Sequence, residues 1–180
     1  VSTAQSISEE LGKLEGFNEE ELAAIYEMIG MGALKYFILK VDPKKRMMFD
    51  PSESIDFNGH TGPFIQYTHA RICSLQRRAA DMGTDVKPES TLHTKEKDLL
   101  KVILRYPEVI QEAADDYSPA VIANYTYDLV KEYNQFYQQV PIFGADSKQD
   151  KAFRIGLSGM VGKVITSAMS LLGITVPERM

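Results

Sequence analysis

Aromatic rings and guanidinium groups recur together in the middle of this sequence. Their spacing of three or four residues would place them on one face of a helix. The residues are Phe64, Tyr67, Arg71, Ser74 and Arg78. Rings stack on unpaired bases, and arginine forks pair with phosphates or base edges, so this face suits single-stranded RNA. The same residue types also border ordinary protein cores, where arginine stems cover apolar surface.

The helix that would position these groups has a clear start. Thr61 is a suitable N-cap, and Gly62 and Pro63 fit the first turn. We expect the helix to run to about residue 83. Its apolar residues form an adjacent stripe that predicts a buried face. This stripe consists of Ile65, Thr68, Ile72, Leu75 and Ala79.

Catalytic chemistry has weaker support. His60 near Asp56, or His69, could form the polar pocket of a small hydrolase, but no nucleophile, metal set or oxyanion motif accompanies them. The single cysteine, Cys73, excludes an internal disulfide and, with three scattered histidines, gives no metal-ligand spacing. We therefore predict no catalytic residue, no cofactor and no metal site in this chain.

Charge is distributed unevenly along the 180 residues. The net charge of −5 argues against a general nucleic-acid binder. However, residues 57–80 and 151–177 contain no acidic side chain. If these two segments form helices that pack side by side, they would create a local positive surface on an acidic body. Its cations would be Arg71, Arg77, Arg78, Lys151, Arg154 and Lys163.

The composition and periodicity predict an all-α bundle with short connections. Asn18 and Glu21 have capping-box spacing, and Gly30 and Gly32 predict either a break or a close helix approach soon afterwards. We find no apolar run near the roughly 20 residues needed to span a membrane, and no signal-like start, which predicts a cytoplasmic protein with no membrane partner.

Further helix starts are predicted towards the carboxy terminus. Thr94 is expected to cap one helix, and Pro107 separates it from a segment over residues 109–117. Ser118 opens a long helix, and Asp146 or Ser147 begins the last one. That last pattern contains glycines at positions 156, 159 and 162. Because each interior glycine costs about 1 kcal/mol relative to alanine, they predict a close approach to a neighbouring helix.

Several segments resemble arginyl-tRNA synthetases. Residues 62–71, GPFIQYTHAR, resemble the GPYxQYxxxR signature that opens the anticodon-binding domain of that family. Residues 32–37, GALKYF, resemble another block of the family, and the segments 171–174, LLGI, and 177–180, PERM, resemble its carboxy terminus. The likeness extends over nearly the whole chain.

This resemblance implies two parts. Residues 1–60 would be the end of the synthetase catalytic body and its connection, and residues 61–180 a DALR-type anticodon-binding helical bundle. The full-length parent would be an ATP-dependent, magnesium-using arginine–tRNA ligase. No HIGH-type or KMSKS-type sequence occurs here, so the chain alone should be inactive. Its partners would be the anticodon loop of arginine tRNA and the missing N-terminal and catalytic domains.

The resemblance also implies roles for individual residues. Phe64, Tyr67 and Tyr137 would stack on bases or enclose them, whereas Arg71 and Arg77 would contact phosphates or base edges. Further contacts are expected from Arg78, from Met180 at the terminus and from the loop residues Asn58, Gly59 and His60. Phe64 replaces a common tyrosine, and Pro141 stands where several members carry a second aromatic residue.

The competing interpretation is a non-catalytic helical protein-interaction module. It predicts that other protein segments bury the rings and arginines between residues 64 and 78. Solvent exposure of Tyr67 and Arg71 distinguishes the two interpretations.

Overall fold

Helices make up most of the chain in this computed structural model, which describes residues 17–48, 54, 56–57, 59–80, 87–88, 91–145 and 147–180. No strand occurs within these ranges, so the predicted all-α fold is confirmed. The described helices are α2 (Glu19–Leu39), α4 (Gly62–Arg78), α5 (Thr94–Leu104), α6 (Tyr106–Asp115), α7 (Pro119–Gln139) and α8 (Lys148–Leu171).

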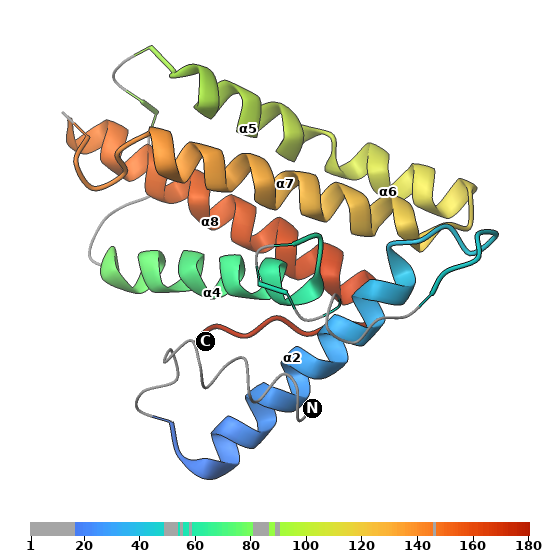
Figure 1. The fold of residues 1–180 in the computed structure, drawn as a ribbon. Coiled ribbons are helices and arrows are strands. Elements are labelled where there is room, and N and C mark those ends of the chain that lie inside the picture. The colour runs from blue at the N-terminus through green and yellow to red at the C-terminus, as the bar shows by residue number, and fades with distance from the viewer. Residues whose placement is uncertain are drawn as a thin grey trace.

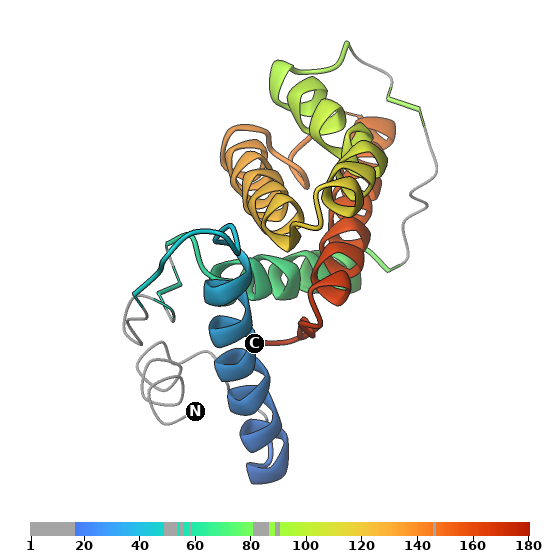
Figure 2. The ribbon, with the colours of Figure 1, turned by 90° about the vertical axis from the view of Figure 1, so that its right-hand side faces the viewer.

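The bundle is organised around α7 and α8. Helix α7 contacts α5 and α6 on one side and α8 and α4 on the other, and α4 packs along α8 (Figure 1). Helix α2 crosses the end of α4 and extends away from the bundle (Figure 2). The carboxy-terminal tail turns back from α8 and runs beneath α4.

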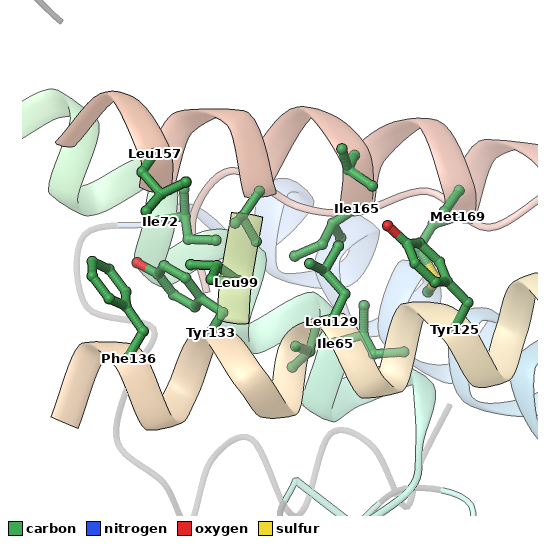
Figure 3. Packing of buried hydrophobic residues seen from close by; sticks show 14 of the residues in the cluster. Ile65, Ile72, Leu99, Tyr125, Leu129, Tyr133, Phe136, Leu157, Ile165 and Met169 are labelled. Carbon is green, nitrogen blue, oxygen red and sulfur yellow. The ribbon is translucent and has the colours of Figure 1, made fainter. Parts of the chain in front are cut away.

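The core lies where α4, α5, α7 and α8 meet (Figure 3). Leu129 and Phe136 of α7 are fully buried there; Leu129 lies beside Ile65 of α4 and Ile165 of α8, and Phe136 lies further along α7, towards Ile72 and Leu157. Deleting a buried leucine or isoleucine side chain of this kind costs about 2–5 kcal/mol. This packing fixes the position of α4 relative to α7. It therefore also determines which side chains of the two helices are exposed along the edge between them.

Several helix ends follow the predictions. Asn18 and Glu21 form a complete capping box at the start of α2, and the side chain of Thr61 accepts a hydrogen bond from the Phe64 amide at the start of α4. Ser147 caps α8 in the same way. The N-cap prediction for Thr94 is wrong, because His93 is the cap and its Nδ1 accepts from the Lys95 amide.

Glycines mark close helix approaches rather than a helix break. Helix α2 is continuous through Gly30 and Gly32, and a Cβ atom on Gly32 would lie 2.5 Å from Nε2 of Gln66. The predicted approach of α8 is also confirmed. Its neighbour is α4, because a Cβ atom on Gly159 or Gly162 would lie 3.1 or 3.0 Å from side-chain atoms of that helix.

Two expectations need correction. Helix α4 ends at Arg78 rather than near residue 83, because the backbone of Ala79 leaves the helical region (φ −106°, ψ 16°) and the Ala80 amide bonds to the Arg77 carbonyl, only three residues earlier. The second expectation is that no apolar run approaches the length of a membrane span. However, a window within α2 has a mean hydropathy of 1.4, so this helix is long and apolar enough to cross a membrane by length and composition alone. A core helix passes the same test, and α2 buries Ile29 and Tyr36 completely.

Candidate functional site

An open pocket of about 370 Å³ is bordered by α4 and by the carboxy-terminal tail. The residues that line it come from α4, from the tail and from the segment before α2. They are Phe17, Tyr67, Ala70, Arg71, Ser74, Arg77, Arg179 and Met180. The structure thus brings four of the sequence-predicted RNA-binding residues together, and the lining combines rings with three guanidinium groups.

Helix α4 presents the pocket side chains because its other face is anchored. Ile65, Ile72 and Leu75 are buried in the core, so the neighbouring arc with Tyr67 and Arg71 turns outward. Both side chains are half-buried and border open space. This exposure is what RNA binding needs and what a face covered by other segments of the chain would lack.

Arg71 is a pocket cation that contacts two rings and an amide group. Its guanidinium carbon lies 5.7 Å from the ring centre of Tyr67 and 4.6 Å from that of Tyr137, so it contacts both rings. It also donates a hydrogen bond of 3.2 Å to Oδ1 of Asn134, whose amide group in turn donates to Thr68. Since a guanidinium has five N–H donors, several remain for a ligand.

Arg77 and Arg78 have different surroundings. Arg77 lines the pocket and donates a 3.1 Å hydrogen bond to the carbonyl oxygen of Glu178. Arg78 lies outside the pocket lining, with its guanidinium carbon 4.5 Å from the ring centre of Phe143 in the loop between α7 and α8. The tail adds Arg179, which lies over the ring of Phe17 at 4.6 Å.

Phe64 and His60 belong to a second aromatic cluster, one helical turn from the pocket. The ring of His60 stacks on Tyr127 of α7, with centroids 3.9 Å apart and an interplanar angle of 25°. Phe64 packs on the same tyrosine at 5.9 Å. Gly59 is half-buried in the loop before α4, and Asn58 lies outside the described residues.

The surroundings of His60 favour a neutral ring. Its Nε2 lies 3.0 Å from the hydroxyl oxygen of Tyr36, and that hydroxyl donates to the carbonyl of Ala123 at 2.7 Å. Because the tyrosine proton is used there, Nε2 is the donor towards Tyr36. Burial, followed by the positive charge of Lys40, lowers the pKa of His60 to about 4.

The hydrolase interpretation gains no support from His69 either. Its Nδ1 lies 2.8 Å from the Pro177 carbonyl oxygen, and its Nε2 lies 2.9 Å from the Thr166 hydroxyl. Cys73 is 3.8 Å from the ring nitrogens, but burial raises the pKa of its thiol, which disfavours the nucleophilic thiolate. Within the described ranges no three His, Cys, Asp or Glu residues could hold a metal ion.

The predicted positive surface is only partly present. Helices α4 and α8 do pack side by side. However, Nε of Arg154 forms a buried ion pair of 2.6 Å with Glu96 of α5, so this cation is neutralised. The cations at the pocket come from α4 and the tail. Arg179 lies next to the predicted Met180 in sequence, whereas no local pattern singles out Phe17 or Asn134.

Comparisons with known proteins point in one direction. A family profile described as the DALR anticodon binding domain matches residues 65–180. The chain is 61% identical over 180 residues to an arginine–tRNA ligase of Flavobacterium psychrophilum and 55% identical over 185 residues to that of Bacteroides thetaiotaomicron. The whole chain is matched in both cases, but it spans only 30% and 31% of the length of these relatives.

The fold agrees with a solved structure of the same kind. The arginyl-tRNA synthetase of Thermus thermophilus superposes with a TM-score of 0.88 at 30% sequence identity. The superposition covers 99% of this chain and 30% of that one.

Proposed function

Since the chain belongs to the DALR anticodon binding domain family, we propose that it is the part of an arginine–tRNA ligase that holds the anticodon loop of arginine tRNA. The observation that carries this proposal is the open pocket, where two rings and three arginines converge within a chain of net charge −5. A local cationic and aromatic surface on an acidic body selects a shaped RNA instead of any polyanion.

The rest of the ligase would supply the chemistry. In this proposal residues 1–60 end the catalytic body, and residues 61–180 form the anticodon-binding bundle. In this proposal ATP and magnesium act in the catalytic part of the ligase, outside this chain. The chain alone would bind tRNA weakly and catalyse nothing. We propose the cytoplasm as its location, with no membrane partner.

An exposed apolar face of α2 agrees with the proposal that another part of the ligase lies against this chain. Met31, Leu34 and Ile38 recur at helical spacing and are 43%, 36% and 46% exposed. Such a face is costly to leave in water, and continuation of the same protein would cover it. The same face would serve a separate protein partner if the chain were an interaction module, which is the competing function.

The RNA would follow the edge between α4 and α7. Along this edge Tyr127, Lys131, Asn134 and Tyr137 of α7 are spaced by three or four residues, over roughly 15 Å at 1.5 Å per residue. Rings lie at both ends, and Lys131 is between them, with Nζ 5.3 Å from the ring centre of Tyr127. Stacking platforms joined by cations are the general design of single-strand binding.

Individual roles follow from the geometry. Tyr67 and Tyr137 would stack on splayed bases, and Arg71 between them would donate to a base edge or phosphate. Phe64, beside His60 and Tyr127, offers a ring but no hydroxyl. Arg77 and Met180 would border the base pocket. Arg78, which is exposed outside the pocket, would contact phosphates, as would the loop with Asn58 and Gly59.

Binding to unmodified transcripts tests the proposal. We expect the 1–180 chain to bind a transcript of arginine tRNA and to bind the same transcript with a substituted anticodon at least tenfold more weakly, since a lost hydrogen bond between a base edge and a charged group costs about 1.5–3 kcal/mol. Equal affinity for both transcripts, or no binding at low salt, would refute anticodon recognition. Retention of a purified catalytic portion but no RNA would instead favour the interaction module.

A further inference from the structure

The tail after α8 is held by side chains rather than by a helix or sheet. It leaves α8 through Gly173, whose φ of +66° allows the Gly173 and Ile174 amides to bond to the carbonyls of Ser170 and Met169. Beyond this point, no residue from 175 to 180 belongs to a described helix or strand. Something else must therefore fix the chain that ends in Met180.

Carbonyl oxygens of the tail accept hydrogen bonds from donors on α2 and α4. Nζ of Lys35 donates to Gly173 at 2.5 Å, Nε2 of Gln66 to Thr175 at 2.8 Å, and Nδ1 of His69 to Pro177 at 2.8 Å. The accepting residues alternate, as in an extended chain whose successive peptide groups face opposite sides. Arg77 adds one more bond, to the Glu178 carbonyl.

Gln66 joins three parts of the molecule. Its side chain is fully buried, and its Nε2 donates both to Thr175 and to the carbonyl of Met28 in α2, at 3.2 Å. Gly32 leaves the space that this amide needs. Both N–H groups are therefore used on backbone oxygens, and the tail is bound to the crossing point of α2 and α4.

His69 binds the tail closer to the pocket. A carbonyl oxygen can only accept, so Nδ1 carries the proton that goes to Pro177. The bond is buried, and Pro177 itself is buried. Two and three residues further on, Arg179 and Met180 form one wall of the pocket. The wall is therefore held in part by a residue outside the pocket lining, in addition to the Arg77 bond to Glu178.

We propose that Gln66 and His69 are positioning residues of the nucleotide pocket, which act by binding the Thr175 and Pro177 carbonyls and so hold Arg179 and Met180 against it. The inference rests on the proposed function, because it concerns the same pocket. A tail without these bonds would be held only by the Arg77 bond to Glu178 and by the packing of Arg179 and Met180, so part of its ordering entropy would be lost on RNA binding and would weaken it.

Three variants of the full chain isolate the His69 contact. His69→Leu removes the donor, whereas His69→Asn keeps an N–H near the position of Nδ1. Thr166→Val removes the hydroxyl beside Nε2 and leaves the tail contact in place. A chain that ends at Val176 lacks the wall altogether. Urea unfolding verifies that each variant is folded before binding is measured.

The first measurement reports on the tail without RNA. The methyl signal of Met180, one of eight methionines, is assigned by its loss from the chain that ends at Val176. We expect this signal to shift towards its free-chain position in His69→Leu and to stay in place in His69→Asn and Thr166→Val. If the Met180 signal does not move in folded His69→Leu, then the bond from His69 to the Pro177 carbonyl does not determine the position of the tail, and the inference is refuted.

The second measurement is affinity for arginine tRNA transcripts. We expect His69→Leu to bind the intact transcript roughly fivefold more weakly, the value of one net hydrogen bond, with recovery in His69→Asn. In the chain that ends at Val176, His69→Leu should not lower the affinity further, because the tail residues through which His69 acts are absent. A released tail with unchanged affinity, or an equal loss in the shortened chain, would overturn the inference. If the unsubstituted 1–180 chain binds transcripts with the intact and the substituted anticodon equally well, the proposed function is overturned instead.

Discussion

Arg71 is held by contacts that leave part of its guanidinium free. The rings of Tyr67 and Tyr137 and the amide oxygen of Asn134 restrain the group, and no ion pair within the described residues neutralises it. A restrained, unpaired arginine loses little side-chain entropy when it binds an anion or a base edge. The same guanidinium contacts the ring of Tyr137, which is 42% exposed.

Replacement of Arg71 should therefore weaken RNA binding. We expect Arg71→Ala to lower the affinity for arginine tRNA by about 1.5–3 kcal/mol, the value of hydrogen bonds to a charged group. Filter binding or fluorescence titration measures the change. Arg105→Ala removes the same group from the exposed carboxy-terminal end of α5 and should have little effect. An equal loss in both variants would indicate general electrostatic attraction rather than a site.

His60 makes stability depend on pH. Its pKa is about 4 in the folded chain, against an ordinary value of 6.5, because burial and then Lys40 disfavour the imidazolium. Above pH 6.5 neither the folded nor the unfolded chain is protonated at this residue. As the pH falls from 6.5 to 4, the unfolded chain binds a proton that the folded chain does not, so the free energy of unfolding falls.

The His60→Gln variant should lack this component. We expect its free energy of unfolding to fall less between about pH 7 and about pH 4.5 than that of the parent chain, as measured by urea unfolding at both values. Carboxylates also titrate in this window, but they do so in both proteins and cancel in the difference. Parallel pH curves would mean that His60 is protonated equally well in the folded state.

At the scale of the helices, α6 and α8 end in the same hydrogen-bond pattern but with different residues. In α8 the left-handed position is Gly173, whereas in α6 it is Tyr117, with a φ of 50°. The amides of Tyr117 and Ser118 bond to the carbonyls of Ala114 and Ala113, so the turn is formed despite the strain. The Tyr117 side chain is 90% exposed and contributes little packing.

Tyr117→Gly should consequently stabilise the fold. We expect a gain of about 1 kcal/mol, because a left-handed conformation costs roughly 1–2 kcal/mol in a residue with a Cβ atom. Chemical denaturation measures the difference. Tyr117→Ala removes the ring but keeps Cβ, so its stability should match the parent. A gain of equal size in both variants would attribute the effect to the ring and not to the backbone.

Features local in sequence were predictable, and features that depend on contacts were not. The cap of α4 and the capping box of α2 follow from short motifs, because the bonding groups lie within four residues. Gly32 shows the opposite case. Its sequence allowed either a break or a close approach, and only the position of Gln66, 34 residues later, decides between them.

The site divides in the same way. Helical spacing placed Tyr67 and Arg71 on one face, since one helix carries both, and the family resemblance supplied their role. The wall made by Arg179 and the partner Asn134 come from segments far along the chain, so no local pattern could place them at the pocket. Arg154 illustrates the converse error. An acid-free segment appeared cationic, but Glu96 arrives from another helix and pairs with it.

For the whole molecule, the distribution of charge matters more for RNA binding than the net charge. The chain carries a net charge of −5, yet three arginines border one pocket and Lys131 lies on the adjoining edge of α7. Phosphates would be attracted to this region and repelled by the acidic remainder. Affinity should then arise from few ionic contacts, with stacking supplying the rest.

The salt dependence of binding measures how many ionic contacts form. If Arg71, Arg77, Arg179 and Lys131 each meet one phosphate of a single-stranded loop, the slope of log K against log salt should be about −3, at about −0.7 per contact. Lys131→Ala should make this slope shallower by about 0.7, whereas Tyr67→Ala should lower the affinity and leave the slope unchanged.

Lys101→Ala is a closely matched control. Lys101 and Lys131 each form an exposed ion pair of 3.4 Å with the aspartate three residues earlier. Equal slopes for Lys131→Ala and Lys101→Ala would remove the α7 edge from the RNA path and confine binding to the pocket.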